Sequence, residues 1–200
     1  MTIHDLVLCI DELGGIATSA QLKKEGFGPG LIDYAFKRGD IDRLTRGVYC
    51  SVDVVDDDFA AVCARWKKCV LSHGSALYLL GLSDRVPFAL DVTVPYGYNP
   101  RSLKAENPGI RIHHVAPELY RLGITEVATP FGACARVYNA ERSVADLIKQ
   151  RVKGVADAQL VRDAIGGYFK KGERDLARLS AVCEAVGVRD ELQMYLEVLA

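Results

Sequence analysis

Basic side chains that could contact phosphate gather in one stretch of the sequence, residues 18–50. This stretch holds six Lys or Arg against four acids, a net charge of +2. The six are Lys23, Lys24, Lys37, Arg38, Arg43 and Arg46. A nucleic acid duplex presents regularly spaced phosphates, and binding gains strength when cations displace its counterions. These residues therefore indicate electrostatic binding of nucleic acid rather than catalysis.

Two short helices would position part of this basic set. Thr18 with Gln21 three residues later predicts a capping box at the start of one helix, which should stop at Gly26. Pro29 suits the first position of a second helix, and Gly39 suits a left-handed cap after its last residue. We therefore expect a helix of about ten residues between Pro29 and Gly39.

A hairpin and a preceding helix complete the predicted motif. Short strands over residues 41–44 and 48–50 flank Gly47, which can adopt the positive φ of a tight turn. Apolar residues at helical spacing over residues 3–13 predict a helix that packs beneath the other two. Three helices followed by a hairpin wing are typical of a winged helix-turn-helix.

The second helix of the pair would present its polar side to a major groove. Its apolar side is formed by Leu31, Ile32, Ala35 and Phe36. Tyr34 and Asp33 are best placed to read base edges, although Asp33 could also cap its own helix. Lys37, Arg38, Arg43 and Arg46 would lie along one phosphate backbone, and Lys23 could add a contact from the preceding helix.

Length and composition limit the alternatives. The chain has 200 residues, half of them hydrophobic, which suffices for one medium domain or two small ones. Its formal charge of −1 confines any nucleic acid contact to patches. Six scattered cysteines without a C-x-x-C pair suggest reduced thiols rather than a zinc site or a disulfide framework. We see no signal peptide and no window of transmembrane length, and so expect a cytoplasmic protein.

The acidic run at residues 56–58 marks the expected boundary between two domains, 1–54 and 55–200. The three acids are read as solvated or as favourable near a helix N-terminus, with a magnesium site as the alternative. The fold class that we expect is α+β. It comprises an N-terminal winged helix-turn-helix and a C-terminal domain with a small sheet and a helical bundle.

Alternating and helical patterns define the expected elements of the second domain. Helices are predicted over residues 59–68 and 72–80, with Ser72 as an N-cap, and four more follow residue 141. Strands are predicted over residues 89–95, 110–115, 124–128 and 135–138. Between Arg142 and Arg178 nine Lys or Arg face five acids, so this basic region could bind DNA, RNA or an acidic protein, or could simply be solvated.

Arrangements that resemble catalytic sites are weak. Asp84 and Asp91 are too far apart in sequence to share magnesium from one strand, as a nucleotidyltransferase would require. The neighbours His113 and His114 point to opposite faces of a strand, which disfavours a shared zinc ion. His73 has no acid beside it to orient the ring, so a hydrolase triad is unsupported. We therefore expect no catalytic residues, no metal site and no cofactor.

Several segments together resemble the AbiEi antitoxins of type IV toxin-antitoxin systems. The resemblance covers nearly the whole chain. Its segments are GGIATSAQLKKEG, GDIDRLTRGVYC, LSHGSALYLLGL, DVTVP and NAERSVADLIKQR. The most specific pieces are Arg46-Gly47 with Tyr49 in the wing, Ser75-Ala76-Leu77 with Gly81-Leu82, and Glu141-Arg142-Ser143 leading into Asp146.

The resemblance implies a winged helix-turn-helix that binds operator DNA and represses its own operon. It also implies a C-terminal domain that counters a cognate toxin with a nucleotidyltransferase fold, with direct contact left open. Lys37, Arg38, Arg43 and Arg46 carry over as DNA contacts. The recognition helix has less arginine and serine than this family leads us to expect.

Three functions from different classes follow. The first is a non-enzymatic autorepressor that binds an inverted repeat in double-stranded DNA, as a dimer or as two cooperating monomers. The second is a protein-docking module without DNA binding. The third is an enzyme that processes nucleic acid.

Overall fold

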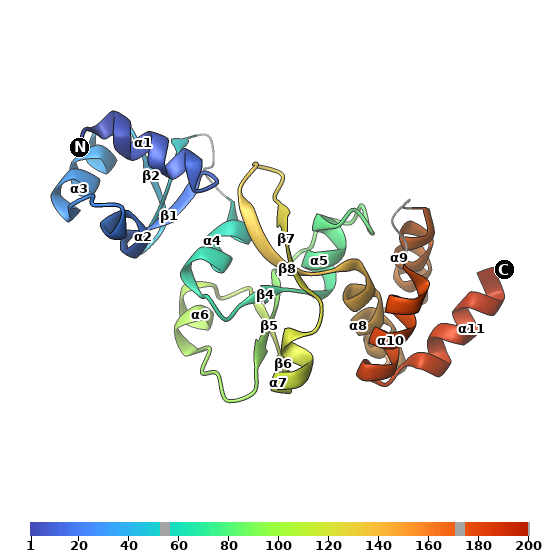
Figure 1. Cartoon of the computed structure of the whole chain (residues 1–200). Coiled ribbons are helices and arrows are strands. Elements are labelled where there is room, and N and C mark those ends of the chain that lie inside the picture. The colour runs from blue at the N-terminus through green and yellow to red at the C-terminus, as the bar shows by residue number, and fades with distance from the viewer. Residues whose placement is uncertain (53–56, 171–174, 200) are drawn as a thin grey trace. The chain divides into compact units, whose positions relative to one another are not determined.

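The computed structural model describes residues 1–52, 57–170 and 175–199 (Figure 1). These residues form two compact units. The N-terminal unit comprises Met1–Cys69 with Glu126–Arg136, and the C-terminal unit comprises Val70–Thr125 with Val137–Ala200. The domain boundary expected between residues 54 and 55 lies outside the described residues. Within the described ranges no helix combines the length and the apolar character that crossing a bilayer requires.

The N-terminal unit begins with the predicted winged helix-turn-helix. Its helices are α1 (Ile3–Glu12), α2 (Ser19–Lys24) and α3 (Pro29–Arg38). Its strands are β1 (Ile16–Thr18), β2 (Asp42–Thr45) and β3 (Val48–Cys50), in the antiparallel order β1-β3-β2. The sequence did not predict β1, which pairs Ile16 with Cys50 and thereby turns the wing hairpin into a three-stranded sheet.

The caps that the sequence predicted are present. The Thr18 side chain accepts a hydrogen bond from the Gln21 amide at 3.2 Å, and Gln21 Oε1 accepts one from the Thr18 amide at 3.0 Å. Gly39 ends α3 in the left-handed conformation, with φ 81°. These local interactions fix both ends of the helix pair, so the bounds of α3 agree with the sequence prediction.

One apolar core holds the three helices together. Leu6 and Ile10 from α1, Leu22 from α2 and Ile32 from α3 are buried together with Ile41 before β2. Ile32 and Ala35 face this core as predicted, whereas Leu31 and Phe36 are only partly buried at its edge. The opposite side of α3 is therefore free to face solvent.

A fourth helix of the N-terminal unit, α4 (Asp58–Arg65), has as its N-cap Asp57, which is buried rather than solvated. Asp57 Oδ1 accepts a hydrogen bond from the Ala60 amide at 3.0 Å, and Asp57 Oδ2 accepts one from the Thr129 hydroxyl. The solvated-linker interpretation is thus wrong for Asp57, because a helix end and a hydroxyl satisfy its carboxylate, whereas the expectation of an acid near a helix N-terminus is confirmed for this residue. Asp56 of the same run lies outside the described residues.

A five-stranded sheet in the order β6-β5-β4-β8-β7 is formed by strands between residues 70 and 138. The strands are β4 (Val70–Leu71), β5 (Asp91–Pro95), β6 (Arg111–Val115), β7 (Ile124–Ala128) and β8 (Cys134–Tyr138). β5 and β6 are parallel, and their register pairs Thr93 with His113. The four strands that the sequence predicted are present, and the two-residue β4 was not predicted.

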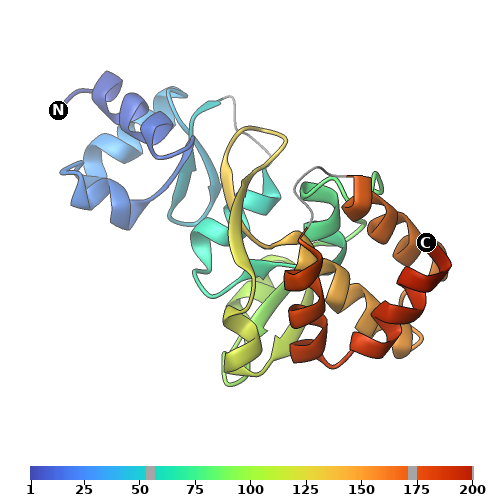
Figure 2. The same ribbon diagram turned by 45° about the vertical axis from the view of Figure 1, so that its right-hand side comes forward.

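The described part of the C-terminal unit contains seven helices. They are α5 (His73–Leu79), α6 (Arg101–Glu106), α7 (Pro117–Arg121), α8 (Ala140–Val152), α9 (Ala158–Lys170), α10 (Leu176–Val186) and α11 (Arg189–Leu199). The last four correspond to the predicted terminal bundle and lie together in both ribbon views (Figures 1 and 2). Val144, Leu147 and Ile148 of α8 are buried in the apolar core that this bundle shares with α5.

The first turn of α8 contains a buried cation. Arg142 has 1% exposure, donates to Asp146 Oδ2 at 3.0 Å and to the carbonyls of Leu119 and Leu122, and stacks on Tyr138. The sequence counted Arg142 in a basic region that could bind nucleic acid, and for this residue the structure contradicts that expectation. Its guanidinium instead connects α8 to α7 and to the residue that follows α7.

Candidate nucleic-acid interface

The basic residues that the sequence singled out are at the surface of the N-terminal unit. Lys37 and Arg38 occupy the last turn of α3, Arg43 is on β2, and Arg46 is in the turn between β2 and β3. All four side chains are exposed. We call these four residues the cationic ridge. The structure therefore places the predicted phosphate contacts where a ligand can reach them.

Ion pairs on α3 change how its polar side can act. Lys37 Nζ lies 2.6 Å from Asp33 Oδ2, one turn earlier, and both side chains are at least 60% exposed. Exposed pairs of this kind contribute only about 0–1 kcal/mol, so a phosphate can displace the carboxylate at little cost. Asp33 does not cap its own helix, because the N-cap of α3 is Gly28 and no side chain bonds there.

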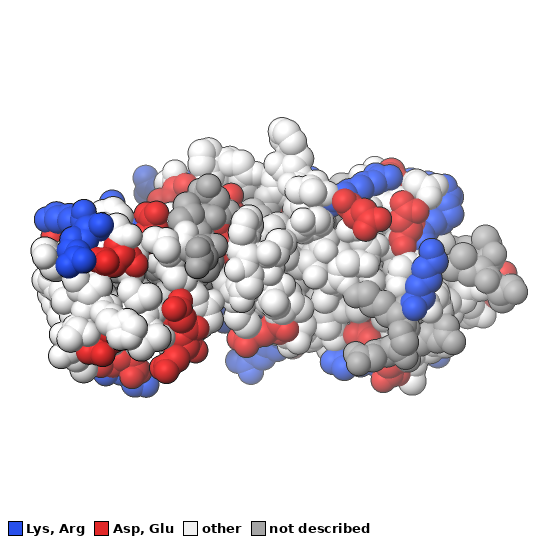
Figure 3. All heavy atoms as spheres, turned by 90° about the horizontal axis from the view of Figure 1, so that it is seen from above, with Lys and Arg blue, Asp and Glu red and all other residues white. Residues whose placement is uncertain are grey.

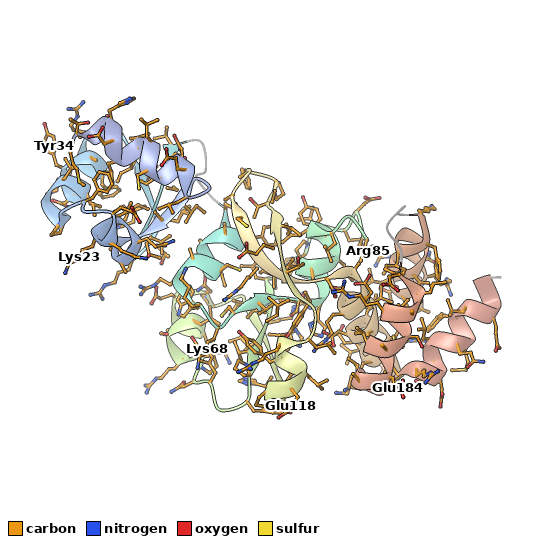
Figure 4. All side chains as sticks on the ribbon, viewed as in Figure 1. Lys23, Tyr34, Lys68, Arg85, Glu118 and Glu184 are labelled. Carbon is orange, nitrogen blue, oxygen red and sulfur yellow. The ribbon has the colours of Figure 1, made fainter. Side chains whose placement is uncertain are left out.

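The aromatic ring of Tyr34 lies beside the ridge. Tyr34 is 54% exposed, and the guanidinium carbon of Arg38 lies 5.7 Å from its ring centroid. Arg38 Nε also lies 3.1 Å from Asp40 Oδ2. Tyr34 and Lys23 both point outward from the N-terminal unit in Figure 4. This arrangement leaves the phenol edge of Tyr34 available to a base while Arg38 orients the ring.

The wing is packed against α3. The guanidinium carbon of Arg43 lies 5.0 Å from the ring centroid of Phe36, and the Phe36 and Tyr49 rings meet edge to face at 6.5 Å. At the wing turn, Gly47 has φ 78°, and its carbonyl accepts a hydrogen bond from the Ser19 amide at 2.9 Å. Helix and wing therefore form one continuous surface.

A hollow of about 270 Å³ adjoins this surface, lined by Ser19, Lys23, Phe27, Pro29, Ile32 and Tyr49. Lys23 thus stands beside the N-terminus of α3, where Gly28 and Gly30 have open space around their α-carbons. Backbone amides at a helix N-terminus bind phosphate oxygens well. The sequence analysis missed this feature, although Gly28-Pro29-Gly30 was a usable signal for an uncapped helix start.

The electrostatic character of the surface is mixed. Figure 3 shows blue and red atoms close together on the N-terminal unit. In the part of the chain that the structure describes, no carboxylate lies within ion-pair distance of Lys23, Arg43 or Arg46. These three cations can therefore contact phosphate without first breaking an ion pair.

Catalytic or metal chemistry has little support at this surface. Among the described residues, no group of three His, Cys, Asp or Glu side chains could hold a metal ion. All six cysteines are free thiols, and four of them are buried. What the exposed residues can do is bind a polyanion through charge, with Tyr34 available for a base.

Comparison with known proteins identifies the same segment. Residues 4–52 match the family model described as "Transcriptional regulator, AbiEi antitoxin". A search of curated proteins found no match. A crystal structure of the RV2827C protein from Mycobacterium tuberculosis aligns with 96% of this chain and 79% of its own, at 14% identity and a TM-score of 0.44. The family match coincides with the winged helix-turn-helix described above, so residues 4–52 are similar to the AbiEi antitoxin transcriptional regulators.

Proposed function

We propose that this chain is a DNA-binding transcriptional autorepressor and the antitoxin of a type IV toxin-antitoxin operon. Residues 1–54 bind the operator, and residues 55–200 form the antitoxin domain that counters a nucleotidyltransferase-like toxin. The description of the matched family, a transcriptional regulator and antitoxin, supports this proposal.

The observation that carries the DNA-binding part is the exposure and continuity of the cationic ridge. Lys37 and Arg38 end α3, and Arg43 stacks on Phe36 of the same helix. A duplex that places its major groove over α3 brings one phosphate backbone across the helix end and the wing. The four cations then meet successive phosphates, and Lys23 meets the backbone on the other side of the α3 N-terminus.

Base readout in this proposal rests on a small set of groups. Tyr34 is the exposed side chain at the middle of α3, and Asp33 can accept from a cytosine amino group once Lys37 turns to a phosphate. Because this set is small, we expect a modest ratio of specific to non-specific affinity for one copy. Two copies on an inverted repeat would raise it, which fits a monomer or weak dimer that dimerises on DNA.

The test is a titration of the upstream promoter fragment by fluorescence anisotropy at several salt concentrations. Each neutralised phosphate contributes about −0.9 to the slope of log K against log salt. Arg43→Ala/Arg46→Ala should therefore reduce the slope by about 1.8 and weaken binding at every salt concentration. Arg101→Ala/Lys104→Ala, which removes two exposed charges from α6, is the matched control and should leave both quantities unchanged.

The docking-module alternative gives the opposite result in the same experiment. If affinity for the promoter fragment stays flat between low and moderate salt, phosphate neutralisation is not operating and the DNA-binding proposal fails. Equal affinity for promoter DNA and unrelated DNA would instead show that the chain binds DNA non-specifically, and would contradict the autorepressor role.

The antitoxin part needs a separate measurement. We propose a cytoplasmic protein whose partner is a toxin encoded beside it, and whose effect does not depend on a stable complex. Co-expression should restore growth of cells that produce the toxin, including with the Arg43→Ala/Arg46→Ala variant. Loss of toxin rescue in that variant would show that protection requires the DNA-binding surface. Turnover of nucleic acid by the purified chain with Mg²⁺ or Mn²⁺ would contradict a non-enzymatic mode of action.

A further inference from the structure

A cavity of about 640 Å³ opens within the C-terminal unit, far larger than a single water site requires. Its walls come from β6, the start of α7, one face of α8 and the residue that begins α5. We call it the His73 pocket. No step of the proposed DNA binding uses it.

One face of α8 gives the His73 pocket its charge. Arg142, Asp146, Lys149 and Lys153 recur at intervals of four, three and four residues, so they share a side of the helix and all line the pocket. The carboxylate of Asp146 is occupied by Arg142 at 3.0 Å. Lys149 Nζ donates to the Val186 carbonyl at 2.9 Å, which holds its ammonium group in place. Because Arg142 and Asp146 neutralise each other, Lys149 and Lys153 give this face of α8 its net positive charge.

Lys153 is the cation of this face that is most available to a ligand. Its side chain is exposed, and within the described part of the chain no carboxylate lies at ion-pair distance from it. An anion that enters the pocket can therefore contact Lys153 without displacing a protein carboxylate.

Two stacked imidazoles form another wall. The rings of His73 and His113 lie 3.7 Å apart between centroids, at 22°. His113 Nε2 lies 2.9 Å from Asp91 Oδ1, which holds that ring. His73 Nδ1 lies 3.0 Å from Ser72 Oγ, and Ser72 Oγ accepts from Thr93 at 2.9 Å. Ser72 is the N-cap residue of α5, as the sequence predicted, but its side chain makes no capping hydrogen bond and contacts the ring of His73 instead.

The Nε2 atom of His73 is the ring nitrogen that can donate a hydrogen bond to a ligand. Burial, and then the positive groups nearby, hold the pKa of His73 well below its usual value, so the ring is neutral at pH 7. We assign the ring proton to Nε2: the Ser72 hydroxyl, which accepts from Thr93, then donates its own proton to Nδ1 of His73. No described residue accepts from that Nε2. His73 also has φ 48°, a left-handed backbone conformation that is uncommon outside glycine and that often marks functional sites.

The mouth of the pocket carries aromatic rings. Tyr96 is 64% exposed, and its ring is nearly parallel to that of His114, at 9° and 6.3 Å between centroids. An exposed aromatic face beside a cationic wall suits a ligand with a planar ring and a negatively charged group.

We propose that the His73 pocket binds a nucleoside 5′-phosphate group, either as a free nucleotide or as the 5′ end of a nucleic acid strand. The phosphate lies against Lys153 and Lys149 and accepts from Nε2 of His73. The base lies on Tyr96. The proposal is independent of DNA binding by the cationic ridge.

The test is isothermal titration of the full chain with AMP, with inorganic pyrophosphate and with a 5′-phosphorylated dinucleotide. Lys153→Ala should weaken all three by about tenfold, since it removes one charge-assisted hydrogen bond. Tyr96→Ala should weaken AMP and the dinucleotide but leave pyrophosphate unchanged. Lys104→Ala removes an exposed lysine from α6, outside the pocket, and should change none of them.

The outcomes separate the two sources of the ligand. Tighter binding of AMP supports a free nucleotide, and tighter binding of the dinucleotide supports a strand end. No saturable binding of any probe at concentrations up to about 10 mM, or equal effects of Lys153→Ala and Lys104→Ala, overturns the proposal. Arg43→Ala/Arg46→Ala should retain nucleotide binding, so failure of the DNA-binding proposal would leave this one standing.

Discussion

Ion pairs have different roles in the two units. On α3 the Asp33–Lys37 pair is open to water, and either partner can leave without uncovering a buried charge. At the start of α8 the Arg142–Asp146 pair is almost fully buried, and each charge depends on the other. Exposed pairs cost little to break and are available to ligands, whereas a buried pair is costly to break and serves the fold. The residue types alone do not distinguish these two ion pairs, whereas the burial of their side chains does.

The largest expected effect comes from breaking the buried pair. Arg142→Ala should lower the free energy of unfolding by about 3–5 kcal/mol, because it leaves Asp146 buried without a partner. Urea denaturation followed by circular dichroism measures this loss.

The control for that variant removes both charges. Arg142→Met/Asp146→Leu should be more stable than Arg142→Ala, since no isolated charge remains in the interior. If Arg142→Ala lowers the free energy of unfolding by less than about 1 kcal/mol, the Arg142–Asp146 pair behaves like an exposed ion pair, and the difference between the two pairs is contradicted.

A smaller effect is expected at the buried cap of α4. Asp57→Ala removes the acceptor of the Ala60 amide and of the Thr129 hydroxyl, and should cost about 2 kcal/mol. Asp58→Ala, at the exposed neighbouring position, is the matched control and should cost less than about 0.5 kcal/mol. Similar losses in thermal or urea denaturation would mean that burial of Asp57 does not set its contribution.

The third effect depends on pH. The pKa of His73 is lowered in the folded chain. As the pH falls below about 6.5, the unfolded chain therefore takes up a proton at His73 while the folded chain does not, and the free energy of unfolding decreases. Between pH 7.5 and 5.5 we expect His73→Asn to lose about 1 kcal/mol less stability than the original chain. Asparagine also tolerates the positive φ of this position.

The comparison for that variant is His114→Asn, at the exposed neighbour of His113. The charged or titratable groups that act on His73 are His113, Arg142, Arg111 and Lys153, and all four remain in both variants. An identical pH dependence of the unfolding midpoint in the two variants would contradict a special role for His73.

The smallest effect on stability is expected at the exposed pair. Asp33→Ala should change the free energy of unfolding by less than about 0.5 kcal/mol, because both side chains are solvated. It should also raise affinity for unrelated DNA about two- to fivefold, since Lys37 is released and a negative charge near phosphate is lost. Anisotropy titration with Glu118→Ala on α7 as a control checks this, and unchanged or weaker binding of unrelated DNA would contradict the release of Lys37.

Local signals explain why the N-terminal unit could be predicted so closely. Thr18 with Gln21, Pro29 and Gly39 each fix a helix end through interactions within a few residues, and the structure confirms them. The three-residue β1, the two-residue β4 and the short α6 and α7 were missed. Such elements are too short to show a period, and β1 and β4 exist only because distant strands pair with them.

Burial of charge is what the sequence could not indicate. Arg142 follows the polar pattern of a surface helix, and its burial depends on carbonyls about twenty residues earlier. The stacking of His73 on His113 likewise requires α5 and β6 to meet. For the candidate interface the sequence predicted the cations and their exposure, while the contact of Arg43 with Phe36 needed the structure. The DNA-binding role of Lys23, Tyr34, Lys37, Arg38, Arg43 and Arg46 stays a prediction.

The anchoring of the wing has a consequence for the nucleic acid itself. Arg43 rests on Phe36, and the Gly47 carbonyl is held by the Ser19 amide, so the span between the helix end and the wing turn is set by the protein. The groove of a duplex must match that fixed span. DNA sequences whose base-pair steps resist compression or widening of the groove therefore bind more weakly. Preference among operators would then arise partly from the stiffness of base pairs that no side chain touches.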